Sequence, residues 1–248
     1  MNVKFKMPRF GKDMMKDNML RELILSTLAT SISIIFTFGT AAWLDHRQKV
    51  KNRRQTAMMV ICDIHAFKSE LQNYQNEYFI KWQNDLKELQ SMSRDSIMQL
   101  SEEELQKYGA AIILPVTFTH DKTAESIFSS DISTWRELGN FKFIRIVGNA
   151  FSYINDIEKN IKAKMDERGG LLMNFETHYD TENIPEDQWM ITFLEQKEVQ
   201  RCITDFCNGF VPYIQGAIQG LDEILDDCLE ITNFTKAELN EFMEEDSQ

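Results

Sequence analysis

The stretch LILSTLATSISIIFTFGTAAWL, from Leu23 to Leu44, contains no charged residue over 22 positions. Charged residues flank it on both sides, at 21–22 and at 45–47. At a rise of about 1.5 Å per residue, a helix of this length crosses the ~30 Å hydrocarbon layer of a bilayer. We therefore expect a single transmembrane helix at 23–44.

This run differs from a cleaved secretory signal, which has a shorter apolar core and small residues at its cleavage site. Here the bulky and charged residues Trp43, Leu44 and Asp45 close the run. A buried core helix is the alternative, but core helices seldom extend this far without a charge. The pattern favours a retained membrane anchor.

The expected span is rich in hydroxyl side chains, with seven Ser or Thr residues. Small side chains let helix backbones approach, and hydroxyls can form hydrogen bonds between helices in lipid. Five of them lie 4, 3, 4 and 3 residues apart and share one stripe, which predicts a seam for self-association or for a partner helix. The alternative is that the hydroxyls bond to carbonyls of their own helix. The seam residues are Ser26, Thr30, Ser33, Thr37 and Thr40.

Charge is distributed very unevenly along the chain. Residues 1–54 carry 11 basic and 4 acidic side chains, and the remainder carries 16 basic and 35 acidic ones. A basic collar beside the span can bind anionic lipid headgroups and set topology, whereas the acidic body argues against nucleic acid as a partner. The collar consists of Arg47, Lys49, Lys51, Arg53 and Arg54.

The orientation of the span stays open. Six basic residues precede it and five follow it closely, which is almost a tie under the positive-inside rule. The short arm at 1–22 favours an N-terminus in the cytoplasm. Four cysteines without a disulfide framework favour a reducing compartment for the body.

The remaining chain predicts an all-α fold, with a basic arm at 1–22, the span at 23–44 and an acidic helical bundle at 45–248. Only 4 prolines and 10 glycines occur in the chain, and the apolar spacing is helical almost throughout. A coiled-coil-like stalk helix is expected at 45–92, continuing from the span. Its apolar stripe steps by 3 and 4 through Val60, Ile64, Phe67, Leu71, Tyr74, Tyr78, Trp82, Leu86 and Leu89.

Further helices have recognisable ends. Ser101 and Glu104 form a capping box before a short helix, and Asn140 starts another helix that we expect to break at 169–170, where two glycines occur. A helix starting at Pro185 is expected to end at Gly209 or at Pro212. A second apolar seam, backed by an acidic face, runs through Val211, Ile214, Ile218, Leu221, Leu225 and Cys228.

The layout resembles a family of single-span bacterial envelope proteins of unknown function. The likeness is carried by a span that ends in Ala-Ala-Trp-Leu at 41–44, by Thr-Ala-Glu-Ser-Ile-Phe at 123–128, by Trp-Arg-Glu-Leu-Gly at 135–139, and by 141–153. The resemblance implies a helical fold and a location in the bacterial inner membrane. It carries no catalytic residue over to this chain.

No pattern of reactive residues emerges from the sequence. Phosphate-binding loops of the Walker or GxGxxG type are missing, as is a GxSxG elbow, and no metal or cofactor site is expected. We predict a non-enzymatic scaffold, adaptor or assembly subunit that binds the bilayer and other proteins or itself. The alternatives are a sensor, marked by a polar cavity inside the bundle, and an enzyme, marked by a deep pocket joining His120 or His178 to several carboxylates.

Overall fold

The structure is a computed structural model, and it describes residues 44–130, 140–178, 184–185 and 188–246. The chain divides into two compact units, Met1–Gln55 and Thr56–Gln248. All regular structure in the described ranges is helical, so the predicted all-α bundle is confirmed. Residues 44–74 are helical, followed by η1 (Gln75–Phe79), α2 (Ile80–Ser91), α3 (Arg94–Met98), α4 (Glu102–Ile113), α5 (Thr123–Ser130), α7 (Phe141–His178), α8 (Trp189–Leu194), α9 (Lys197–Asp205), η4 (Phe206–Phe210), α10 (Val211–Thr232) and α11 (Lys236–Asp246).

In the described part of the chain, no helix is both long and apolar enough to cross a bilayer. The predicted span at 23–44 lies outside the described residues, apart from Leu44. The same holds for all residues of the predicted seam, which are Ser26, Thr30, Ser33, Thr37 and Thr40.

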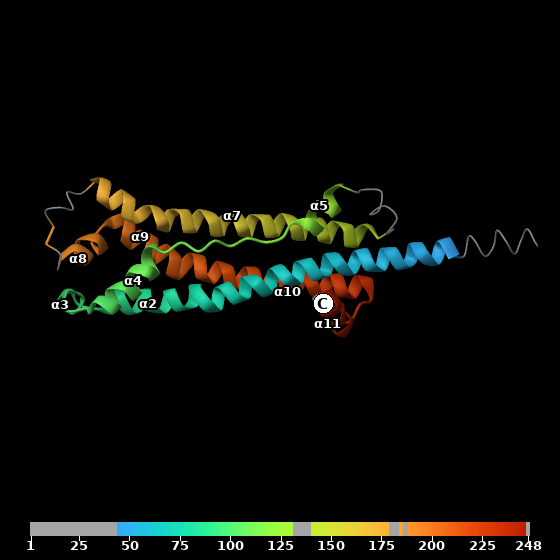
Figure 1. The fold of residues 1–248 in the computed structure, drawn as a ribbon, viewed down its shortest axis with the longest axis horizontal. Coiled ribbons are helices and arrows are strands. Elements are labelled where there is room, and N and C mark those ends of the chain that lie inside the picture. Colours follow the sequence, from blue (N-terminus) through green and yellow to red (C-terminus); the bar gives the residue numbers. More distant parts are fainter. Residues whose placement is uncertain (1–43, 131–139, 179–183, 186–187, 247–248) are drawn as a thin grey trace, which may run out of the picture. The chain divides into compact units, whose positions relative to one another are not determined.

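Three long helical runs build the described part of the second unit (Figure 1). The first comprises residues 56–74, called the 56–74 helix below, with η1 and α2. The second is α7, which runs in the same direction as the first. The third comprises α9, η4 and α10; it runs antiparallel to both and packs on α7 and η1.

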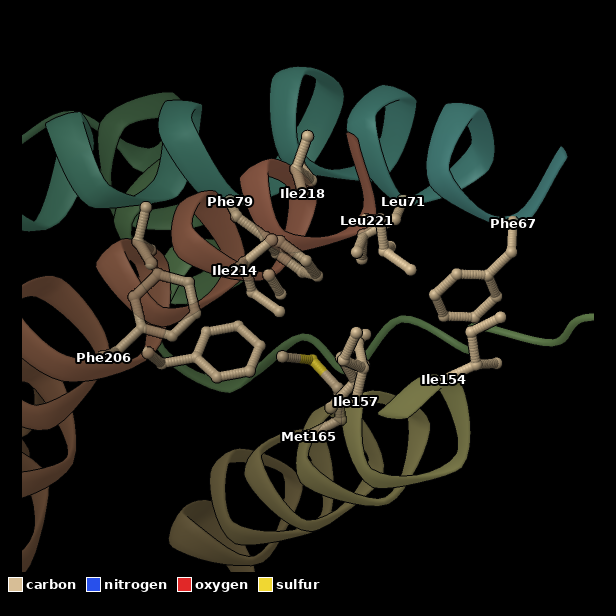
Figure 2. Close-up of a cluster of buried hydrophobic side chains, with 14 of the residues drawn as sticks. Phe67, Leu71, Phe79, Ile154, Ile157, Met165, Phe206, Ile214, Ile218 and Leu221 are labelled. Carbon is tan, nitrogen blue, oxygen red and sulfur yellow. The ribbon is translucent and has the colours of Figure 1, made fainter. Parts of the chain in front are cut away.

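Apolar side chains from all three runs meet in one core, as Figure 2 shows. Full burial of each such side chain contributes roughly 1.5–3 kcal/mol of transfer free energy. The six residues of the predicted seam on α10 are all buried, which confirms that prediction. The core side chains labelled in Figure 2 are Phe67, Leu71, Phe79, Ile154, Ile157, Met165, Phe206, Ile214, Ile218 and Leu221.

Two helix starts follow the sequence signals. The Ser101 hydroxyl accepts a hydrogen bond from the Glu104 amide at 3.3 Å, and the Glu104 carboxylate accepts one from the Ser101 amide at 2.8 Å. This reciprocal pair is the predicted capping box. The Asn140 side chain accepts a hydrogen bond from the Phe143 amide at 3.2 Å, and α7 begins where it was expected.

The predicted helix break at 169–170 is wrong. Helix α7 continues through Gly169 and Gly170 to His178 without a break. Glycine costs a helix only about 1 kcal/mol per residue, and the flanking Arg168 and Leu171 are both buried, so packing outweighs that cost. The Pro185 carbonyl accepts a hydrogen bond from the Gln188 amide, and α8 begins at Trp189. The predicted helix start at Pro185 includes residues 186–187, which lie outside the described ranges, so it stays a prediction.

Gly216 and Gly220 lie four residues apart on α10, as a GxxxG pattern, and have different surroundings. A Cβ atom added at Gly220 would lie 3.2 Å from the Tyr153 hydroxyl oxygen, whereas one added at Gly216 would meet nothing within 4 Å. We expect Gly216→Ala to raise the free energy of unfolding by about 0.5–1 kcal/mol through helix propensity. Gly220→Ala is expected to lower it, since Tyr153 must move away. Urea unfolding of the two matched variants checks this, and equal shifts would contradict it.

Candidate functional site

Arg168 is the most deeply buried charged residue among those described, with 1% of its surface exposed. It lies on α7, within the stripe of core residues that includes Met165 and Leu171. Burial of a charged side chain is rare unless it is paired. The surroundings of Arg168 therefore need an explanation.

The guanidinium group caps the C-terminal end of α4. Its Nε donates a hydrogen bond to the Ile112 carbonyl at 3.1 Å, and its Nη2 donates one to the Ala111 carbonyl at 2.6 Å. Both carbonyls belong to the last turn of α4, where a helix lacks its own donors and carries partial negative charge. Its Nη1 donates a hydrogen bond to the Met165 sulfur at 3.7 Å. Arg168 thus closes a helix end that would otherwise be buried without donors.

Two aromatic rings cover the remaining faces of the cation. Its central carbon lies 4.2 Å from the centre of the Trp82 ring and 4.6 Å from that of Phe206. Cation–π contacts of this kind contribute about 2 kcal/mol when they are desolvated. Trp82 comes from α2 and Phe206 from η4. One side chain therefore ties together α2, α4, α7 and η4.

No carboxylate in the described ranges forms an ion pair with Arg168. Burial lowers the pKa of its guanidinium to about 10, so the group keeps its proton at neutral pH. Its electrostatic interactions with titratable groups are with the Cys202 and Cys207 thiols. Burial raises the pKa of the Cys202 thiol to about 11 and also raises that of Cys207. Both thiols are thus protonated at neutral pH and are poor nucleophiles.

Two π-helical turns occur in the described helices, and one of them, η4, contacts this arginine through Phe206. Turn η1 lies on the first run and η4 on the third, and Phe79 of η1 packs edge-on against Phe210 of η4 at 5.2 Å between ring centres. Single π-turns inside helices are rare and occur frequently at functional sites. Here Phe206 of η4 covers the guanidinium directly, and Phe79 of η1 packs against Phe206 and Trp82, the two rings that cover it.

Pro212 explains one of the two turns. It has no N–H, so the Cys207 carbonyl, five residues earlier, lacks the backbone donor of a π-helical turn. The Gln83 amide donates a hydrogen bond to that carbonyl instead, at 2.5 Å, and the Cys207 thiol lies 3.9 Å from the Gln83 carbonyl. The expected helix end at Gly209 or Pro212 is therefore wrong. The chain is helical from Lys197 to Thr232.

His178 and His120, the two histidines named in the sequence analysis, lie in different surroundings. His178 is exposed and lines a cleft of about 440 Å³ together with Glu195 and Glu198, and its Nδ1 lies 2.7 Å from the Asn174 carbonyl oxygen. His120 is buried against Asp63. Within the described ranges, no group of three or more His, Cys, Asp or Glu side chains converges to hold a metal ion.

The predicted collar lies on the helical segment 44–55 of the first unit. At 100° per residue, positions 47, 51 and 54 share one face of the helix and positions 49 and 53 share the opposite face. The Lys49 ammonium forms an ion pair of 3.1 Å with Asp45. Except for the half-buried Arg53, these side chains are exposed: Arg47, Lys49, Lys51, Arg53 and Arg54.

Sequence reasoning missed Arg168, although a signal was present. It occupies an apolar position of the α7 stripe, three residues after Met165 and three before Leu171. A charged residue at a core position indicates either a functional group or a buried helix cap.

A search among protein-family models, curated proteins and solved structures finds no match to this chain.

Proposed function

We propose that this chain is a membrane-anchored helical-bundle protein that acts through contacts with other proteins, as a scaffold, adaptor or assembly subunit. The observation that carries this proposal is the uncharged run at 23–44, which leads directly into a helix carrying a basic collar. The collar side chains occupy both faces of that helix over about 10 Å of its axis, a depth suited to a headgroup layer. Its partners are then the bilayer and other proteins.

The interior of the bundle favours this class over an enzyme. The most deeply buried charged group of the described residues, Arg168, has its donors engaged by carbonyls and sulfur. The two thiols that interact with it electrostatically, Cys202 and Cys207, have raised pKa values. Such a group is suited to holding helices together rather than to chemistry on a substrate.

A single-span sensor is the second candidate. The Arg168 junction favours it, because a shift of α4 or α7 would be passed directly to α2 of the first helical run. In both cases we place the chain in the bacterial inner membrane, on its resemblance to single-span envelope proteins. The same seam at Ser26, Thr30, Ser33, Thr37 and Thr40 is the proposed site of self-association.

Fractionation of cells tests the anchor. The full chain is expected in the membrane pellet after an alkaline carbonate wash, whereas a chain that starts at Asp45 is expected in the aqueous fraction. Crosslinking in native membranes then tests the seam. Changing Thr30, Ser33 and Thr37 to Leu should shift the ladder towards monomer, while Leu at Thr27 and Ser31, off the stripe, should leave it unchanged.

Recovery of the full chain in the aqueous fraction, without detergent or cleavage near residue 44, would remove the proposal. An unchanged ladder in the triple variant would remove self-association through the seam alone.

A further inference from the structure

The segment between α4 and α5 crosses the bundle as an extended strip. Residues 114–122 have no helix or strand, and every second residue from 116 to 120 is at least half-buried: Val116, Phe118 and His120. Nine extended residues cover about 30 Å, and Figure 1 shows this green strip running back along α7. It connects two helices that lie far apart along the bundle.

Side chains hold this strip against the 56–74 helix. The Tyr74 hydroxyl donates a hydrogen bond to the Thr117 carbonyl at 2.9 Å. The ring of Phe118 packs edge-on against Phe67 and Tyr74, at 5.4 and 5.1 Å between centres. The His120 ring also packs edge-on against Phe67, at 5.0 Å. These contacts cover Phe67 and Tyr74 on the 56–74 helix.

The far end of the strip and α5 rest on α7. The Lys122 ammonium forms an ion pair with Glu158 at 2.6 Å. The Asn155 amide donates a hydrogen bond to Glu125 of α5 at 2.6 Å. One α5 residue, Ala124, is buried beneath the helix. Strip and α5 together therefore lie over both the 56–74 helix and α7.

Backbone pairing contributes little to this attachment. Across the described residues, positions 115–121 make no backbone–backbone hydrogen bond. Helices and sheets normally supply these bonds, and segments without them open at low free-energy cost. The cover is thus attached by side chains alone.

The less exposed of the two ion pairs on this strip joins His120 to Asp63. The His120 Nε2 lies 3.5 Å from the Asp63 Oδ2, with 6% and 14% of the side chains exposed. Neither atom has a hydrogen-bond partner, so attraction between opposite charges is what favours the contact. The other charges near His120 are Glu70 on the 56–74 helix, Glu158 on α7, and its chain neighbours Asp121 and Lys122.

We propose that residues 114–130 are a detachable cover over the 56–74 helix and α7, pinned closed by the ion pair between Asp63 and His120. The ion pair between Asp63 and His120 persists while His120 is protonated. Once that proton leaves, the Asp63 carboxylate remains buried beside a neutral ring, and opening returns it to water. This inference goes beyond the proposed function and does not depend on the membrane anchor.

The direction of the pH dependence follows from the pKa of His120. Burial lowers that pKa, but Asp63, Glu158 and Glu70 outweigh burial and leave it raised above 6.5. The closed state therefore binds the proton more tightly than the open state, in which the ring is solvated. Closure is favoured below pH 6.5 and is lost as the pH rises through the raised pKa.

A cysteine reporter beneath α5 tests the proposal in the full chain purified in mild detergent. In Ala124→Cys, maleimide labelling of the new thiol is followed by peptide mass spectrometry, which separates it from the native cysteines. Each rate is divided by the rate of the urea-unfolded chain at the same pH, which removes the titration of the thiol itself. The normalised rate is expected to rise several-fold from pH 6 to pH 9.

Three matched variants complete the test. Adding His120→Gln should abolish the pH dependence. Adding His65→Gln should preserve it, because His65 lies on the 56–74 helix, as Asp63 does, but its partners Ser69, Lys68 and Asp222 lie outside the cover. A reporter at Ala217→Cys, buried on α10, should stay protected throughout. If Ala124→Cys perturbs folding, Val116→Cys serves as the second reporter. A flat profile in the parent, an equal rise with His120→Gln, or an equal rise at position 217 would each overturn the proposal.

Discussion

Replacing Arg168 by Met is expected to lower the free energy of unfolding by about 2–4 kcal/mol, a large share of the stability of an ordinary domain. The Ala111 and Ile112 carbonyls would lose their donor in a buried place, and each unsatisfied group costs about 1–3 kcal/mol. The contacts with Trp82 and Phe206 would weaken as well. Relief of the buried charge offsets part of this loss, because an arginine without a carboxylate partner is itself costly.

Urea unfolding followed by circular dichroism measures the effect, and Arg145→Met is the matched control. Arg145 lies on the same helix but is exposed, so its replacement should stay within about 0.5 kcal/mol of the parent. Arg168→Lys separates charge from geometry. A lysine keeps the charge but lacks the planar fork that reaches two carbonyls at once, so we expect it to be destabilised nearly as much as the Met variant.

A result for Arg168→Met within about 0.5 kcal/mol of the parent would contradict the capping role. A fully stable Arg168→Lys together with an unstable Arg168→Met would show that charge alone matters. The junction would then be an electrostatic one, without the geometric constraint that links α4 to α2.

Apolar periodicity was sufficient to predict the bundle and its two principal seams. On the first helical run, the predicted positions Val60, Ile64, Phe67 and Leu71 are all buried. Side chains at spacings of 3 and 4 fall on one face of an α-helix, and that face is visible in a single sequence. The capping box at Ser101 was equally local, since its partners are three residues apart.

The same periodicity failed where the helix changes its pitch. The sequence stripe placed Tyr74 and Tyr78 in the core, but Gln75 and Phe79 are the buried residues and both tyrosines are only half-buried. Turn η1 widens the helix at 75–79, so two successive steps of 4 carry the buried face from Leu71 to Phe79. A π-turn is stabilised by its tertiary neighbours, and these are invisible in a pattern of spacings.

Arg168 could not be assigned a role from sequence for a related reason. Its partners at Ala111 and Ile112 lie 57 and 56 residues away, and they are backbone carbonyls rather than side chains. No spacing rule connects an arginine to the end of a distant helix. The position of a charge within an apolar stripe was the one local sign of it.

Replacing Gln83 by Leu is expected to lower the free energy of unfolding by about 1–3 kcal/mol, because it leaves the Cys207 carbonyl without a donor in a partly buried place. Gln90→Leu, at an exposed position of the same helix, is the matched control and should change the free energy of unfolding by less than about 0.5 kcal/mol. Urea unfolding of both variants measures the difference.

The decisive experiment combines Gln83→Leu with Pro212→Ala. Alanine at 212 supplies the N–H that proline lacks, and this donor can reach the Cys207 carbonyl in the π-turn or the Asn208 carbonyl in a regular turn. The loss caused by Gln83→Leu should therefore be smaller in the Pro212→Ala background, by about 1 kcal/mol of coupling in a double-mutant cycle. Strictly additive effects would show that Gln83 does not replace a donor removed by Pro212. The π-turn would then be held by the aromatic contacts of Phe79 with Phe206 and Phe210.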